Sequence, residues 1–171
     1  MVDRTEFLMY ARRLHNALRH EIENMDVSPD KLPTERPLFE HFASGLYLAG
    51  CLAFLEGKYG TQPYLPKSPS QETFDQFLLN LPKKPASAFL AAGISQSGVQ
   101  ALVCIRNALT HNDGDLAKNT DKSCLAKVSA ANLPGVSISD SQVTLSSNAN
   151  TDFMEYVRKS FVAISMFHGG G

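Results

Sequence analysis

Long apolar runs and paired metal-ligand motifs are both missing from this sequence. A transmembrane helix needs roughly 18 or more consecutive apolar residues, and no such run exists, so we expect no membrane span. The three cysteines form no CxxC pair and the five histidines form no His-x3-His pair, which disfavours a zinc site. The glycine-rich phosphate-binding, dinucleotide-binding and serine-hydrolase motifs are also absent. We therefore expect no bound metal and no cofactor.

An excess of charge of one sign is missing as well. The sequence has 16 Lys+Arg and 17 Asp+Glu, a formal net charge of −1. This balance excludes a uniformly basic nucleic-acid coat but leaves room for a local basic surface. Residues 1–6 are too charged for a secretory signal, and three cysteines without metal spacing suit a reducing compartment. We expect a cytoplasmic protein in which Cys51 and Cys104 are buried thiols and Cys124 is a candidate for exposure.

Apolar periodicity indicates a helical protein. With 171 residues and 43% hydrophobic content, the chain is expected to form a single domain over residues 1–171. Apolar spacing predicts helices over residues 3–24, 38–56, 72–80, 86–111 and 152–167. Prolines and glycines predict loops over residues 25–37 and 57–72. Because residues 38–56 are apolar nearly all round, they are expected to form a central helix buried on most sides.

Turn signals complete this outline. The helix over 86–111 is expected to be interrupted between Gly93 and Gly98, and Asn112-Asp113-Gly114 is a strong stop signal. Residues 115–135 look irregular, whereas residues 136–146 alternate apolar and polar side chains around a turn and predict a small hairpin. The fold class is therefore all-α, a bundle of four to five helices with a small β-hairpin before the last helix.

One polar cluster stands out at the end of a predicted helix. Arg106, Asn107, Thr110 and His111 lie in its last turns, just before the stop signal. At about 100° per residue, Asn107 and His111 share one face, and Arg106 and Thr110 share the neighbouring one. The alternative is a purely structural role, in which Arg106 pairs with an acidic residue on another helix and His111 caps the end of its own helix. The same spacing recurs at Arg36 and His41, but this copy spans Pro37 and is interpreted as a coincidence.

The pattern Arg106-Asn107-x-x-x-His111, late in an all-α domain of this size, resembles the HEPN superfamily. This resemblance implies a HEPN-like helical bundle that forms a homodimer, with the two motif helices facing each other across one composite site. It implies that Arg106 and His111 are the catalytic pair and that Asn107 supports them. Many members are metal-independent endoribonucleases of toxin–antitoxin, abortive-infection or other defence systems, so the partners expected from the resemblance are RNA and an antitoxin or other protein.

The chemistry of these side chains fits such a reaction. RNA cleavage without a metal needs a base for the 2′-hydroxyl proton, an acid for the leaving 5′-oxygen and positive charge near the phosphate. Histidine titrates near neutrality and serves as base or acid, and arginine grips phosphate oxygens bidentately. The sequence thus favours an endoribonuclease. Two alternatives stay open: a non-catalytic HEPN-like module that binds an antitoxin or a nucleotidyltransferase, and a plain helical scaffold with an accidental motif.

A second group of basic residues lies on the first predicted helix. Arg12, Arg13 and Arg19 are candidates for binding RNA phosphates, together with Thr110 near the motif. The alternative is an ordinary solvated helix face. No acidic residue occurs between Phe7 and His20 or between Gln76 and Asn112. If the first helix and the motif helix pack side by side, the net charge of −1 conceals one positive face around the motif.

Overall fold

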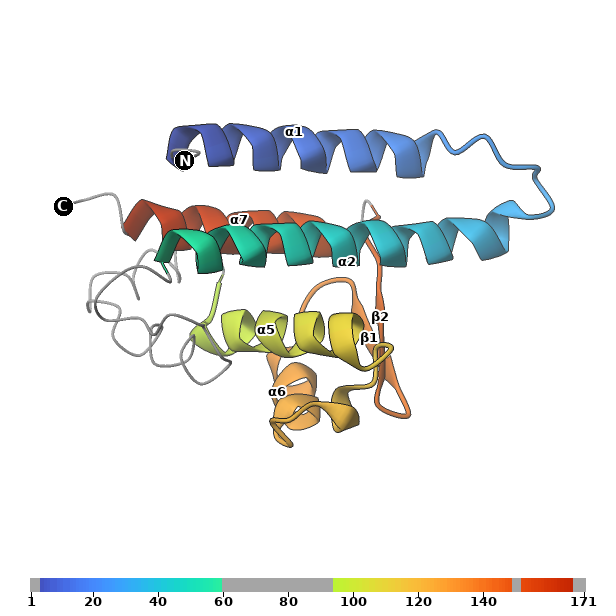
Figure 1. Cartoon of the computed structure of the whole chain (residues 1–171). Coiled ribbons are helices and arrows are strands. Elements are labelled where there is room, and N and C mark those ends of the chain that lie inside the picture. The colour runs from blue at the N-terminus through green and yellow to red at the C-terminus, as the bar shows by residue number, and fades with distance from the viewer. Residues whose placement is uncertain (1–3, 60–93, 149–151, 168–171) are drawn as a thin grey trace.

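The computed structural model describes residues 4–59, 94–148 and 152–167, which contain five α-helices and one β-hairpin (Figure 1). Helix α1 (Arg4–Glu23) covers a layer made by α2 (Leu32–Tyr59) and α7 (Phe153–Phe167), and α5 (Gln96–His111) with α6 (Cys124–Ala131) lies beneath that layer. The expected all-α architecture with a small hairpin is confirmed. The predicted helix over 72–80 and the first part of 86–111 lie outside the described residues.

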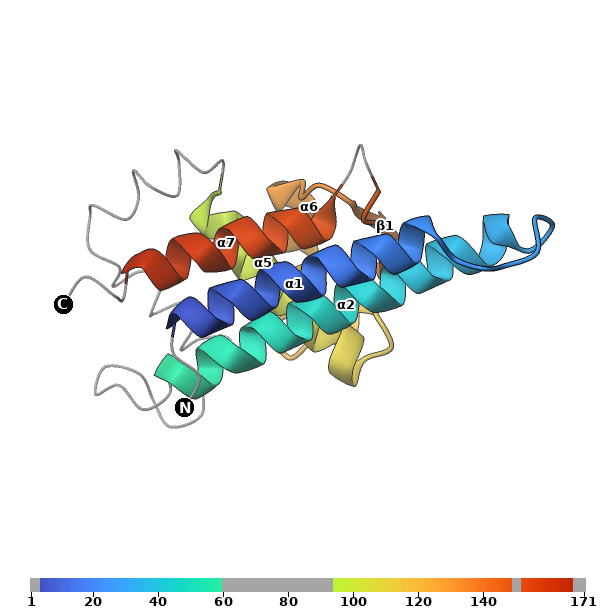
Figure 2. The ribbon, with the colours of Figure 1, turned by 90° about the horizontal axis from the view of Figure 1, so that it is seen from above.

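The first and last helices form where the apolar spacing predicts them. On α1, Ala11 and Ile22 are buried, and on α7 Phe153, Val157 and Phe161 are at most 1% exposed. Ala11 and Ile22 lie 11 residues apart, about three helical turns, and the three residues of α7 recur every four residues, so each helix buries one face. The carboxylate of Asp152 caps α7 by accepting the backbone N–H of Glu155 at 2.9 Å. Figure 2 shows α1 lying over this layer with α7 and α2 on its two sides.

Helix α2 corrects two expectations. It begins at Leu32, inside the predicted loop, because Pro33 sits in the first turn, where a helix needs no backbone N–H. Pro37 lies inside the helix and forgoes one backbone hydrogen bond, a cost that the packing of the remaining turns outweighs. The helix is also not buried on most sides. It exposes a row of three large apolar side chains, Leu38 at 59%, Phe42 at 69% and Leu46 at 66%.

Helix α5 takes the central position that the sequence suggested for residues 38–56. Val99, Leu102 and Ile105 are fully buried, and the helix packs against both α2 and α6. It starts after Ser95, whose hydroxyl accepts the backbone N–H of Gly98 at 2.9 Å. It stops where predicted. Asn112 is the C-cap, and the chain then turns through positive φ angles at the next two residues, Asp113 and Gly114.

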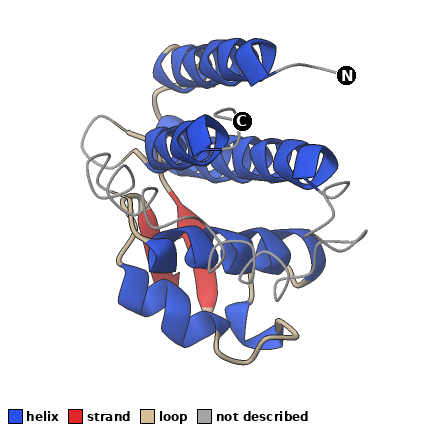
Figure 3. Cartoon of the chain, turned by 90° about the vertical axis from the view of Figure 1, so that its left-hand side faces the viewer, coloured by secondary structure: helices blue, strands red, loops and turns tan. Residues whose placement is uncertain are grey.

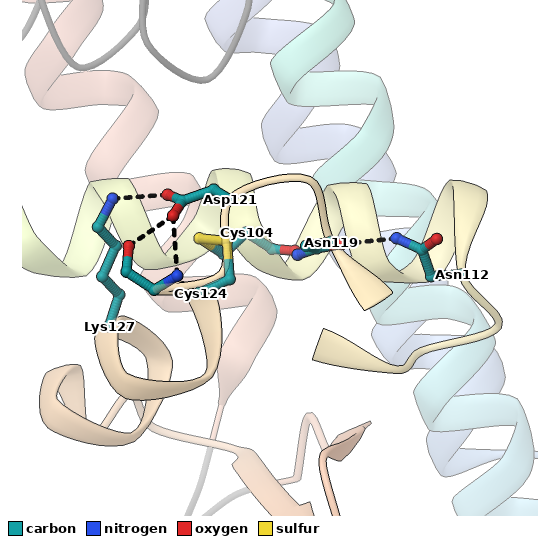
Figure 4. Close-up of a disulfide and its surroundings, with 7 residues drawn as sticks. Cys104, Asn112, Asn119, Asp121, Cys124 and Lys127 are labelled. Atoms are coloured by element: carbon teal, nitrogen blue, oxygen red, sulfur yellow. Dashed lines mark hydrogen bonds and ion pairs between the residues drawn. A yellow bond between two sulfur atoms is a disulfide. The ribbon is translucent and has the colours of Figure 1, made fainter. Parts of the chain in front are cut away.

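Residues 115–135 are more regular than expected. They form a short 3-10 helix η1 (Leu116–Lys118) and the two-turn helix α6. A disulfide between Cys104 of α5 and Cys124 of α6 holds this segment against α5 (Figure 4). The expectation that Cys124 is exposed and Cys104 is a free thiol was wrong, since both are buried and bonded. The partners are 20 residues apart in sequence, and only the path of the loop brings them together.

The predicted hairpin forms from β1 (Val136–Ser139) and β2 (Gln142–Leu145), paired antiparallel with Val136 opposite Leu145. Asp140 and Ser141 both have positive φ, as a two-residue type I′ turn requires. The buried Val143 and Leu145 face the core. Helix α2 is hydrogen-bonded to β2, because His41 Nδ1 accepts the backbone N–H of Leu145 at 3.1 Å. Burial lowers the pKa of His41, which favours the neutral ring that this bond needs.

Candidate functional site

The end of α5 carries the polar cluster found in the sequence. Arg106 and Asn107 are half-buried, whereas Thr110 and His111 are exposed. The intervening Ala108 is fully buried, so the helix is anchored in the core up to its last turn. The structure therefore presents the polar side chains at the rim of a rigid element, which is a suitable base for a binding or catalytic site.

Within one chain the two proposed catalytic side chains do not face the same point. Arg106 and His111 are five positions apart, which places their Cα–Cβ directions about 140° apart around the helix. The Nε atom of Arg106 is buried, and the hydroxyl of Thr110 donates to the carbonyl oxygen of Arg106 at 2.8 Å. Within the described part of the chain, no hydrogen bond or ion pair joins Arg106 to His111. The exposed Thr110 thus uses its hydroxyl proton for a backbone carbonyl of its own helix.

A polar and covalent brace holds the loop that follows α5 (Figure 4). The buried Asn119 donates its side-chain N–H to the carbonyl oxygen of Cys104 at 2.9 Å and accepts a bond from Asn112 at 2.7 Å. The disulfide adds a covalent tie at Cys104, two residues before Arg106. Sequence reasoning found the stop signal but missed this brace, because an asparagine in a polar stretch gives no sign of burial.

Asp121 fixes the start of α6 beside the disulfide. Its carboxylate accepts a hydrogen bond from Lys127 Nζ at 2.8 Å and two from Ser123, from the backbone N–H and the hydroxyl. The bond from Lys127, followed by those from Ser123, lowers the pKa of Asp121 to about 2. Asp121 and the two sulfurs of Cys104 and Cys124 lie within 4.8 Å of one another. In this structure the two sulfurs are joined to each other, and the carboxylate is held by Lys127 and Ser123.

The basic residues predicted on the first helix separate into two kinds. Arg12 and Arg13 are exposed, and no ion pair reaches either of them from the described residues. Arg19 forms ion pairs with Asp152 and, at 3.3 Å, with Glu23, so its charge is already neutralised. Helix α1 packs on α2 and α7, with that layer between it and α5 (Figure 3). The condition for one positive face shared by α1 and the motif helix is therefore not met.

A cluster of titratable groups fills the space between α1, α2 and α7. His15 is 6% exposed, and its Nε2 lies 3.7 Å from Asp152 and 3.9 Å from Glu155. Burial alone would raise the pKa of Asp152, but His15 and Arg19 outweigh it, and the pKa is lowered. Tyr47 donates to the carbonyl oxygen of Ala11 at 3.1 Å, and burial raises its pKa. These contacts tie α1 to the rest of the bundle.

Between α1 and α7 the surface is hollowed into a pocket of about 630 Å³. Its lining combines three arginines, one amide and two apolar side chains, namely Arg12, Arg13, Arg158, Asn16, Met9 and Val162. The sequence analysis named Arg12 and Arg13 but missed Arg158. The available signal was its position three residues after Glu155 on a predicted helix, yet its place beside α1 follows only from the packing of α7.

In comparisons with known proteins, no family model, no curated protein and no solved structure matches the chain. In the described ranges, no helix is long and apolar enough to cross a membrane.

Proposed function

We propose that this chain is a metal-independent endoribonuclease that cleaves RNA by attack of the 2′-hydroxyl on the adjacent phosphate. The observation that carries the proposal is the exposed His111 at the end of the buried helix α5, five positions after Arg106. Histidine moves protons near neutral pH and arginine stabilises charge on the phosphate. The expected products are a 2′,3′-cyclic phosphate and a 5′-hydroxyl. Asn107, half-buried between the two, is proposed to support them.

The proposed site needs two chains. Because Arg106 and His111 diverge by about 140° around one helix, a second copy is the natural source of a complementary pair. The exposed row of Leu38, Phe42 and Leu46 offers a surface for that copy, since exposed apolar patches commonly mark protein interfaces. Leu109 of α5 lies against Gly45 in the same stretch of α2, so this row borders the motif end of α5. We propose a homodimer through this face.

The test is cleavage of a labelled single-stranded RNA in the presence of EDTA. We expect His111→Ala and Arg106→Ala each to lower the cleavage rate by about 100-fold or more, in line with the loss of a general acid–base or charge-stabilising group. His20→Ala, which removes another exposed helix-end histidine, is the matched control and should cleave at the wild-type rate. Cleavage that persists undiminished in both motif variants, with wild-type melting temperatures, would rule the proposal out.

The exposed row on α2 also favours a second candidate, a non-catalytic module whose apolar face binds another protein. The two functions differ in their oligomeric state. The nuclease proposal predicts a dimer in sedimentation equilibrium that Phe42→Glu converts to a monomer. The second candidate predicts a wild-type monomer that does not cleave RNA. Because Phe42 is 69% exposed, its replacement should leave the fold intact, which the melting temperature will verify.

A further inference from the structure

The hollow between α1 and α7 combines features that a phosphorylated ligand requires. Three guanidinium groups line it, from Arg12, Arg13 and Arg158, and no carboxylate is among its described lining residues. Like charges gathered in a concave site repel one another and attract an anion. Arg12 and Arg13 are not committed to an ion pair with any described residue. Their positive charge is therefore available to a bound ligand.

Arg158 is held in position for such a ligand. Glu155 accepts two hydrogen bonds from it, from Nε at 2.6 Å and from Nη2 at 2.7 Å. This ion pair neutralises the charge of Arg158, so the uncompensated positive charge of the pocket comes from Arg12 and Arg13. A guanidinium carries five N–H groups, so three N–H donors of Arg158 stay available to hydrogen-bond a second anion. Glu155 is itself next to the buried His15, at 3.9 Å, and 3.8 Å from Lys159. The fork of Arg158 is thus fixed by a network that belongs to the α1–α7 contact.

The other residues that line the pocket indicate which groups, besides a phosphate, would fit in it. Met9 and Val162 are apolar, and Asn16 adds one amide that both donates and accepts hydrogen bonds. A volume of about 630 Å³ is in the range of small-molecule sites and far exceeds the size of a bare phosphate ion. Methionine adapts to flat groups, and arginine stacks on them. Phosphate, a flat ring and polar edges together describe a nucleotide.

We infer that the pocket between α1 and α7 binds a nucleotide, with its phosphate on Arg12, Arg13 and Arg158 and its base against Met9 and Val162. The nucleotide is either a free mononucleotide or the 5′-phosphorylated end of an RNA strand, which share this chemistry. The lining residues of the pocket belong to α1 and α7, and α1 lies on the far side of the α2–α7 layer from α5 (Figure 3). It is therefore separate from the proposed nuclease site and does not depend on it.

Isothermal titration of the full chain tests this inference, with AMP, adenosine and two RNA decamers that carry either a 5′-phosphate or a 5′-hydroxyl. The 2′-hydroxyls of both decamers are methylated, so the proposed nuclease site cannot cleave them. A free-nucleotide site predicts that AMP binds at least tenfold more tightly than adenosine. A strand-end site predicts the same ratio between the two decamers, with weaker binding of AMP. Each lost charge-assisted bond costs roughly tenfold in affinity. If neither phosphorylated probe binds, or if the phosphate gives no advantage in either pair, the inference is overturned.

Variants locate the binding. The double substitution Arg12→Gln and Arg13→Gln should weaken binding of the phosphorylated probe by about tenfold or more. Lys31→Gln removes another exposed cation, in the turn before α2, and should bind as the wild type does. The comparison of AMP with adenosine needs neither RNA nor cleavage, so a failure of the nuclease proposal leaves this test intact. Unchanged affinity in the double variant, with wild-type melting temperature, would show that the pocket is not the site.

Discussion

Replacing Cys104 and Cys124 together by alanine should lower the free energy of unfolding by about 3 kcal/mol. The disulfide closes a loop of 20 residues, and a crosslink of that span removes about 11 cal/mol/K of entropy from the unfolded chain in the loop-closure relation, equivalent to about 3.3 kcal/mol at 25 °C. For a chain of this length, a change of that size corresponds to roughly 6–12 °C in melting temperature.

The assay is urea unfolding at 25 °C followed by far-ultraviolet circular dichroism, with and without reductant. Without reductant, the wild type should unfold at a higher urea concentration than the double variant. With reductant, the difference should shrink, because the unfolded wild-type chain then loses its crosslink as well. Cys51→Ala is the matched control. Burial raises the pKa of the Cys51 thiol to about 12, so it stays protonated, and this variant should keep the full response to reductant.

Two results would refute the reasoning behind this prediction. One is a denatured, unreduced wild type that shows three reactive thiols instead of one. The other is a wild type whose midpoint of urea unfolding is the same with and without reductant. Either would mean that Cys104 and Cys124 are only packed against each other and that η1 and α6 are held by non-covalent contacts alone.

Four further substitutions probe the same half of the molecule. Gly135→Ala should destabilise the chain by about 2 kcal/mol or more, seen as a lower urea midpoint, because φ is +71° there and the new Cβ would lie 2.1 Å from the carbonyl oxygen of Ser146. Asn119→Ala should cost about 1–3 kcal/mol in the same assay, since it removes a buried hydrogen bond to the Cys104 carbonyl oxygen and the acceptor of the Asn112 side chain. Asp121 has a folded pKa of about 2, below its unfolded value of about 3.9, so its contribution is complete above about pH 4 and is lost as the pH falls through 2. The free energy of unfolding should therefore fall less steeply with decreasing pH in Asp121→Asn. Lys127→Gln should reduce this pH dependence as well, because it removes the main cause of the lowered pKa of Asp121.

Much of the helical framework could be predicted because its causes are local. The stripe of Ala11 and Ile22, the cap at Asp152 and the stop at Asn112 each depend on residues within a few positions of one another. The start of α2 could not be predicted in this way. Proline is tolerated in a first turn and disfavoured later, so three nearby prolines suggested a loop where the longer helix and its packing prevail.

The two candidate sites differ in the same way: one is formed by neighbouring residues of a single helix, and the other by residues far apart in the chain. The order Arg106, Asn107, Thr110, His111 is visible in the sequence, because these residues belong to one helix end. The arginine pocket is not, since Arg158 lies about 145 residues from Arg12 and Arg13 and meets them only where α7 packs on α1. The pairing of Arg19 with Asp152 has the same origin, and it removes one of three arginines expected to bind phosphate.

Propensity, capping and turn chemistry act over a few residues, so the helical periodicity, the hairpin and the polar end of α5 follow from the order of residues alone. Packing settles which helix is central, which cysteines are bonded and which charges are neutralised. Those outcomes depend on contacts between residues far apart in the chain. The near-zero net charge shows the effect of both composition and packing. The total of −1 excluded a basic coat, and packing then placed Arg12, Arg13 and Arg158 together in one pocket, away from the motif at His111.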